Sequence, residues 1–243
     1  MLENPTAVDV LVALRSVANP GRVADYARFF KTGPGQYGEG DQFLGLSVPQ
    51  TREVAKQYKG LDLAEIYELV RSTFHEARLC ALVILTTRYE RSKSAAERAE
   101  LFAFYLDTAR AGFVNNWDLV DVTAPRIGSY LVAEMDDPMA LLTELAGEQS
   151  LWLRRLSVLF TFAFIRAGQF QPTIDIVTLH LTDVHDLMHK ACGWMLREVG
   201  NRDSDALRAY LTQYASVMPR TMLRYAIEKL PEPERQSWLV NSR

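Results

Sequence analysis

The sequence predicts an all-α fold, an α-solenoid built from antiparallel helix pairs, and three observations predict it. Apolar residues recur at helical spacing through most of the 243 residues, and no segment shows the alternation of a half-buried strand. Short polar or Gly/Pro breaks separate segments of about ten to seventeen residues. The segments also repeat in pairs, with a period of roughly 33 to 40 residues that is typical of HEAT-like repeats.

Each predicted helix follows from its apolar spacing and from the breaks that bound it. Asn19-Pro20-Gly21 ends the first helix, and Pro49 fits the first turn of the third. The expected helices cover Thr6–Ala18, Val23–Phe30, Pro49 to about Lys59, Leu61–Arg71, Glu76–Glu90, Ala95–Ala111, Trp117–Glu134, Pro138–Gly147, Leu151–Arg166, Pro172–Leu181, Asp186–Val199, Asp205–Tyr214 and Arg220–Leu230. Residues 236–240 are expected to form only a short capping turn.

Composition limits the classes of protein that this chain can belong to. Apolar residues make up 48%, enough for a large core, and the net charge of −3 excludes a bulk polycation. The two cysteines, Cys80 and Cys192, lie in apolar helical patterns and indicate a reducing compartment. The N-terminus lacks the order of a signal peptide, and the most apolar run, Val158–Ile165, is too short to span a bilayer. We expect a cytoplasmic monomer of one domain, 1–243, with a Gly-rich loop insertion at 31–48 and a C-terminal cap at 231–243.

The repeats predict where charge gathers. Equivalent inner helices begin at His75, Asn115, Ser150, Asp186 and Pro219. In a stacked solenoid these helices line one concave face. Several carry basic residues in their first turns, which predicts a basic groove on that face; alternatively, these residues are ordinary solvated helix ends. The basic residues are Arg78, Arg154, Arg155, Lys190, Arg220 and Arg224.

A glycine-rich segment interrupts the helical pattern. Gly33, Gly35 and Gly38 form a literal GxGxxG, the fingerprint of dinucleotide binding. That interpretation fails because no strand precedes the motif, no helix opens at it, and Glu39 and Asp41 would repel a phosphate. A long mobile loop or a small hairpin is the better prediction.

The main candidate site is Asn115-Asn116-Trp117-Asp118-Leu119-Val120-Asp121. An Asn pair is a good helix N-cap, and Trp117 and Asp121, four residues apart, share one helix face. A flat indole beside a fixed carboxylate suits a substrate that becomes cationic as it reacts. The alternative is a core Trp and an Asp that caps the helix or forms an ion pair.

Overlaying the repeats adds two residues to this pair, Arg155 and Trp194. If the inner helices are neighbours, two indoles, one carboxylate and one guanidinium converge, and the rings can pack on sugars or bases. Trp194 could also be an ordinary core residue. The candidate phosphate contacts are Arg154, Arg155, Lys190, Arg197, Arg220, Arg224 and Lys31. His185 and His189 have metal-ligand spacing, but no HExxH accompanies them, so no metal is expected.

These motifs together resemble one family, the AlkD-like DNA alkylation-repair proteins. The resemblance covers roughly Val23 to Leu230 and rests on motifs in a specific order. They are Phe43-Leu44-Gly45 with Pro49 and Arg52, Trp117-Asp118-x-Val120-Asp121, Trp152-Leu153-x-Arg155, and Lys190-Ala191-x-Gly193-Trp194-x-Leu196-Arg197-Glu198.

The resemblance implies a HEAT-like solenoid that wraps double-stranded DNA and, in its glycosylase members, removes cationic N3- and N7-alkylated purines without inserting the base into a pocket. It implies that Asp121 is the catalytic carboxylate, that Trp117 and Trp194 pack against the backbone of the lesion, and that Arg155 contacts DNA. No cofactor is implied. Here Phe29 stands where an aromatic hydroxyl is expected, and the 33–41 loop is longer than in compact members.

Three functions follow as hypotheses. The first is a monofunctional glycosylase for cationic alkylpurines. The second is a non-catalytic binder of branched or damaged DNA, as in related branches of the superfamily. The third is a protein–protein scaffold, the default for a solenoid without other clues.

Overall fold

The computed structural model describes residues 4–241, and the fold in that range is all-α, as predicted. No strand occurs among these residues; one isolated parallel bridge joins Gln42 to Phe74. The elements are α1 (Ala7–Ser16), a short 3-10 helix (Pro20–Arg22), α2 (Val23–Phe29), α3 (Val48–Gln57), α4 (Leu63–Val70), α5 (His75–Arg91), α6 (Ala95–Arg110), α7 (Trp117–Ile127), α8 (Ser129–Ala133), α9 (Pro138–Ala146), α10 (Leu151–Arg166), α11 (Gln171–Leu179), α12 (Asp186–Gly200), α13 (Ser204–Tyr214), α14 (Arg220–Ala226) and α15 (Glu232–Asn241).

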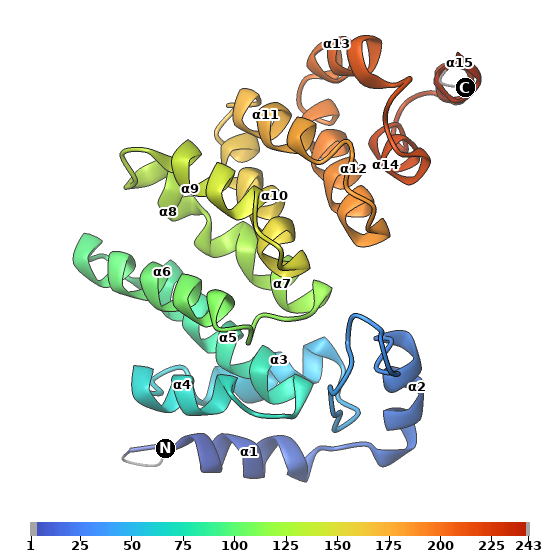
Figure 1. The fold of residues 1–243 in the computed structure, drawn as a ribbon. Coiled ribbons are helices and arrows are strands. Elements are labelled where there is room, and N and C mark those ends of the chain that lie inside the picture. The colour runs from blue at the N-terminus through green and yellow to red at the C-terminus, as the bar shows by residue number, and fades with distance from the viewer. Residues whose placement is uncertain (1–3, 242–243) are drawn as a thin grey trace. The chain divides into compact units, whose positions relative to one another are not determined.

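The helices form two compact units, Met1–Thr123 and Ala124–Arg243. In the first unit α5 is central, since it packs against α3, α4 and α6, and α1 packs against α3 and α4 (Figure 1). Its core includes Tyr105, Leu14 and Leu82, which are completely buried. Successive helices therefore pack against each other here as α4–α5 and α5–α6, and α3 also packs against α5.

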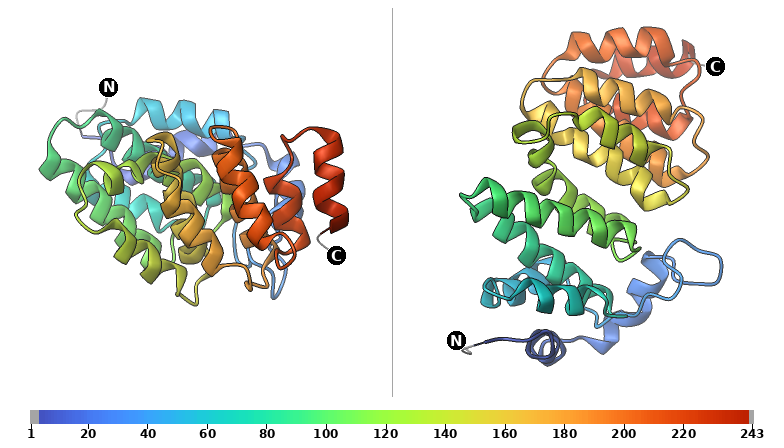
Figure 2. Two further views of the ribbon diagram at one scale, coloured as in Figure 1. Left: turned by 90° about the horizontal axis from the view of Figure 1, so that it is seen from above. Right: turned by 60° about the vertical axis from the view of Figure 1, so that its left-hand side comes forward.

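In the second unit α10 and α12 are the inner helices. Helix α10 packs against α9, α11 and α12, and α12 packs against α13 and α14 (Figure 2). Phe160 of α10 is completely buried, as is Met195 of α12. The inner helices α5, α7, α10, α12 and α14 begin within two residues of the starts that the repeat pattern predicts.

The contact between α12 and α14 depends on Gly193. A Cβ built at this position would lie 2.5 Å from the carbonyl oxygen of Met222 and 2.5 Å from Cβ of Tyr225. The Met222 oxygen is a backbone atom and the Tyr225 Cβ is bonded to the backbone, so neither can move aside by a side-chain rotation. The two helices would therefore have to separate to admit a methyl group.

We therefore predict that Gly193→Ala lowers the free energy of unfolding by about 1–3 kcal/mol. Urea unfolding of the two proteins measures the difference. Gly60→Ala is the control, because a Cβ there meets no atom within 4 Å. Equal midpoints for Gly193→Ala and the wild type would contradict the close-packing argument.

Two predicted elements differ most from the structure, and α14 ends at Ala226, four residues before the predicted Leu230. The single helix expected over Trp117–Glu134 is divided into α7 and α8. Pro125 removes one backbone N–H inside α7, and Gly128 follows where α10 approaches so closely that a Cβ would lie 2.9 Å from the Phe160 ring. The expected capping turn at 236–240 is part of a ten-residue helix, α15, in which Pro233 occupies the tolerated first turn.

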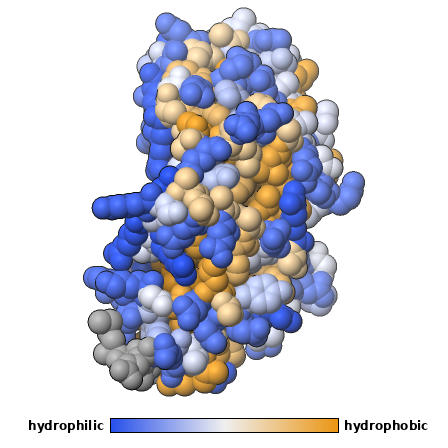
Figure 3. Space-filling view, turned by 90° about the vertical axis from the view of Figure 1, so that its left-hand side faces the viewer, coloured by the Kyte–Doolittle hydropathy of each residue, from blue (hydrophilic) through white to orange (hydrophobic). Residues whose placement is uncertain are grey.

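The surface carries scattered apolar side chains. Val8 and Val12 of α1, Val184 in the segment before α12 and Val240 of α15 are 60–93% exposed, and the face in Figure 3 shows apolar patches between hydrophilic ones. Apolar surface of this kind is ordinary for a folded chain. Over residues 4–241, no helix is both long and apolar enough to cross a bilayer.

Candidate active site

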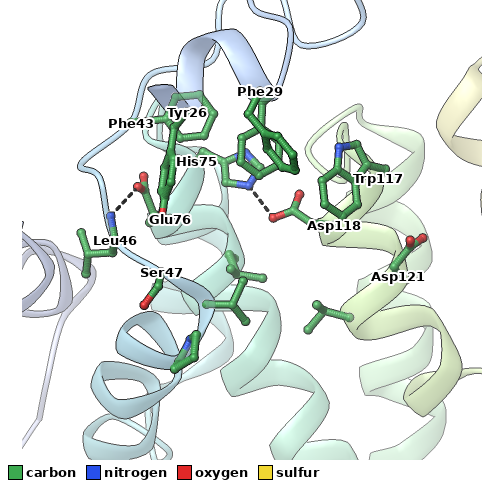
Figure 4. A pocket seen from close by; sticks show the side chains of 15 residues that line it. Tyr26, Phe29, Phe43, Leu46, Ser47, His75, Glu76, Trp117, Asp118 and Asp121 are labelled. Atoms are coloured by element: carbon green, nitrogen blue, oxygen red, sulfur yellow. Dashed lines mark hydrogen bonds and ion pairs between the residues drawn. The ribbon is translucent and has the colours of Figure 1, made fainter. Parts of the chain in front are cut away.

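A pocket of about 360 Å³ opens in the first unit (Figure 4). Helices α2, α3, α5 and α7 all contribute to its wall, together with the segment that leads into α3. Six aromatic or imidazole rings and three carboxylates line it. The lining residues are Tyr26, Phe29, Phe30, Phe43, Leu46, Ser47, Val48, Pro49, His75, Glu76, Leu79, Trp117, Asp118, Asp121 and Val122.

The predicted pair Trp117 and Asp121 lies together in this wall, on the first two turns of α7. Asn116 begins the helix: its backbone carbonyl accepts from Val120 N–H, and its side-chain oxygen accepts from Trp117 N–H at 2.9 Å. The first two turns of α7, which carry the pair, therefore begin at the pocket wall (Figure 4).

The indole of Trp117 belongs to an aromatic stack. The ring of Phe30 lies nearly parallel to it, with centroids 5.4 Å apart, and also stacks on Phe43 at 5.1 Å. Phe29 meets the indole edge-on at 5.8 Å and is itself 62% exposed. The indole is therefore held in a fixed plane by neighbouring rings, while the exposed Phe29 stands beside it at the rim.

A buried charge network lies behind the stack. The imidazole of His75 is 3.0 Å from Asp41 Oδ2 through Nδ1 and 2.8 Å from Asp118 Oδ2 through Nε2. Arg78 donates to the other oxygen of Asp41. All four side chains are at most 6% exposed. Two carboxylates and two cations balance only if His75 carries a proton.

The electrostatics favour that proton. Burial by itself lowers the pKa of His75, but the charge and hydrogen bond of Asp118 and the hydrogen bond of Asp41 outweigh it and raise this pKa to about 9. For the carboxyl of Asp41 burial acts in the other direction and raises the pKa, yet His75, Arg78 and Asn116 together bring this pKa below its ordinary value. At neutral pH His75 is an imidazolium that donates from both nitrogens.

Glu76 organises the opposite wall. Its carboxylate is 2% exposed and accepts backbone N–H groups of Leu44 (2.9 Å), Gly45 (2.8 Å) and Leu46 (3.0 Å). Three donors on one buried carboxylate satisfy its charge and fix the chain that carries Phe43 into the aromatic stack.

The pocket lining has a definite chemical character. It contains Glu76, Asp118 and Asp121 against one imidazolium, and no Lys or Arg occurs among the described residues that line it. Aromatic faces and carboxylates attract cations, and a wall without guanidinium or ammonium groups does not attract phosphate. The pocket therefore suits a group on which positive charge develops.

The Gly-rich loop is not the hairpin that was one of the two predictions for it. Its turns are closed by its own side chains: Gln36 accepts from Gly33 N–H at 3.0 Å and Glu39 from Gly35 N–H at 2.8 Å. The backbone donors that a dinucleotide phosphate would need are thus occupied. The loop ends at Asp41, in the buried network.

The second unit holds the other predicted site residues. Trp194 is half-buried on α12, with its ring 6.4 Å from Phe162 and its N–H bonded to Glu198 at 3.3 Å. Arg155 is only 4% exposed and donates to the carbonyl of Leu187. Trp194 lies on α12 and Arg155 on α10.

The remaining basic residues differ in their pairing. Arg154 pairs with Asp183 at 2.8 Å, Lys190 with Asp186 at 2.7 Å, Arg197 with Glu228, and Arg220 donates to Leu239 O at 2.8 Å. Lys31 and Arg224 are exposed, and neither has an ion-pair partner within residues 4–241. Lys31 also has a positive φ of 53°, which is uncommon for a side chain other than Gly.

Sequence reasoning missed the network of Asp41, His75 and Asp118. These residues lie 34 and 43 positions apart, and no spacing rule connects a loop aspartate to the starts of two helices. No group of three His, Cys, Asp or Glu side chains with metal-binding geometry occurs in the described part of the chain.

The all-α fold of helix pairs, with an indole and a carboxylate in one pocket, defines the chain as a helical-repeat protein with a candidate active site. Comparison with known proteins identifies its family. The model of the DNA alkylation repair enzyme family matches residues 10–230, and the chain therefore belongs to that family. Among curated proteins none matches.

A solved structure supports the fold. The chain resembles a predicted DNA alkylation repair enzyme from Enterococcus faecalis with a TM-score of 0.69 and 17% identity. The match covers 88% of this chain and 97% of that one. At this identity the likeness concerns the fold, and it confirms the α-solenoid-like architecture expected from the repeats.

Proposed function

We propose that this protein is a monofunctional DNA glycosylase that removes cationic N3- and N7-alkylated purines from double-stranded DNA. The observation that carries the proposal is the placement of Trp117 and Asp121 together in an aromatic, carboxylate-lined pocket of a DNA alkylation repair family member. The damaged base need not enter a pocket, because the chemistry required of the protein is directed at the sugar.

The pocket chemistry fits this reaction. An alkylated purine cation leaves without prior protonation, so no general acid is needed. Breaking its N-glycosidic bond puts positive charge on the deoxyribose, which a fixed carboxylate near C1′ stabilises. We assign that role to Asp121, which also orients the attacking water, and assign the packing of indoles against the sugar to Trp117 and Trp194.

The direct test is incubation with methylated duplex DNA, followed by identification of released bases by mass. The proposal expects 7-methylguanine and 3-methyladenine in the free fraction and no release of unmodified purines. Absence of release with salt-sensitive DNA binding, stronger on junctions than on duplex, would favour the non-catalytic binder instead. Absence of DNA binding at low salt would leave the protein–protein scaffold as the remaining hypothesis.

We propose that DNA contact involves basic residues of both units, from the set Arg154, Lys190, Arg197, Arg220, Arg224 and Lys31; Arg155, expected in this set from the sequence, is buried and bonded to the Leu187 carbonyl and is left out of it. Lys31 and Arg224 are the sharpest tests, because no ion pair has to be broken first. Either Lys31→Gln or Arg224→Gln should lower the slope of log affinity against log salt by about one.

Fluorescence anisotropy with a labelled duplex over a range of salt measures this slope. Lys93→Gln is the control, because it removes the same charge from a residue that is exposed in the turn between α5 and α6. Equal slopes for Lys31→Gln, Lys93→Gln and the wild type would remove Lys31 from the interface.

A further inference from the structure

The Gly-rich loop and the indole of the pocket are connected through buried polar contacts. Asp41, the last residue of the loop, accepts from His75 on α5, from Arg78 one turn later and from Asn116 at the start of α7. Its side chain is only 4% exposed. One carboxylate thus joins the loop to two helices. A loop that only connects two helices over the surface needs no buried contact of this kind.

Three routes run from this carboxylate to Trp117. The amide of Asn116 donates to Asp41 at 3.2 Å and accepts from the Trp117 backbone N–H at 2.9 Å. His75 holds Asp118, the residue after Trp117, at 2.8 Å. The imidazole also packs against Phe30, with centroids 4.8 Å apart, and Phe30 stacks on the indole.

We propose that Asp41 and His75 are positioning residues that set the plane of the Trp117 indole in the pocket. The Gly-rich loop then acts as a strut whose end fixes the start of α7. The consequence for base excision rests on the proposed function, whereas the orientation of the indole does not.

The physical reason is charge balance in a buried site. Asp41 and Asp118 are balanced by His75 and Arg78, so removing one charge leaves a buried charge unpaired and the group rearranges. Both hydrogen-bonded routes lead to the first turn of α7. A shift there moves the indole relative to the Asp121 carboxylate, one turn away on the same helix.

The test is Asp41→Asn, which keeps the shape of the side chain and removes its charge. Protein labelled with 5-fluorotryptophan gives one fluorine resonance for each of its four tryptophans, and Trp117→Phe identifies that of Trp117. The proposal expects the Trp117 resonance to shift or broaden in Asp41→Asn, while those of Trp152, Trp194 and Trp238 stay in place.

Tyr105→Phe is the matched control. It removes another buried hydrogen bond onto α7, the one between the hydroxyls of Tyr105 and Thr123 at 2.7 Å, beyond the first turn. The Trp117 resonance should remain unchanged in this variant. An unchanged Trp117 resonance in Asp41→Asn, with a lowered melting temperature, would reduce Asp41 to a stabilising residue and overturn the proposal.

Single-turnover kinetics give the second readout. In Asp41→Asn the rate constant of base release should fall roughly 10- to 100-fold, with DNA affinity unchanged, because positioning rather than binding is lost. His75→Gln, which keeps a side-chain N–H donor, should behave alike and serves if Asp41→Asn does not fold. If the wild type releases no base, the glycosylase assignment fails, and the fluorine spectra still decide the positioning role.

Discussion

Asp121→Asn should reduce the release of 7-methylguanine from methylated duplex DNA by at least about 100-fold. The substitution conserves size but removes the negative charge that, in the proposed reaction, stabilises the positive charge developing on the sugar. Loss of one preorganised electrostatic contact of this kind typically lowers a rate by 10²–10³-fold. Single-turnover release, followed by mass detection of the free base, measures the effect.

DNA affinity should be unchanged or slightly higher in the same variant, because a carboxylate near the phosphate backbone repels it. Asp107→Asn is the control: Asp107 is exposed on α6, and its loss changes the net charge equally. Wild-type release rates in Asp121→Asn would reject Asp121 as the catalytic carboxylate, whatever the DNA affinity.

The protein should lose stability as the pH rises from about 6.5 to about 9, and His75 should cause the loss. Its folded-state pKa of about 9 exceeds the ordinary value of 6.5, so the folded protein keeps a proton that the unfolded chain releases. The stabilisation is complete below pH 6.5 and disappears as pH passes through 9. A difference of this size corresponds to about 3 kcal/mol.

Urea unfolding at intervals across this pH range measures the effect, with His75→Gln for comparison. The variant should be less stable near neutral pH, by about 3–5 kcal/mol, because Asp41 and Asp118 lose their shared cation. Its stability should also fall less than that of the wild type over the window. Burial raises the pKa values of the Cys80 and Cys192 thiols, but both proteins contain them, so their effect cancels. Parallel profiles for the two proteins would show that His75 is not the titrating group.

Local pattern was sufficient for most of the fold. Helical spacing and breaks placed α10 over Leu151–Arg166, the predicted range, and the repeat period located the inner helices. The pair Trp117 and Asp121 was also predictable, because residues four apart on a helix share a face whatever surrounds them. The prediction of a short C-terminal turn was wrong in length. Pro233 signals a break in the sequence, but proline is tolerated in the first turn of a helix, and α15 runs through it.

What only the tertiary structure decided is the environment of that pair. The sequence by itself determined the helices, their repeat and the helix face that carries the indole and the carboxylate, because these depend on neighbours within one turn. The stack of Phe30 on Trp117, the three donors on Glu76 and the imidazolium between Asp41 and Asp118 join residues tens of positions apart. Contacts of that kind depend on how loops and helices pack, and packing is a property of the whole unit.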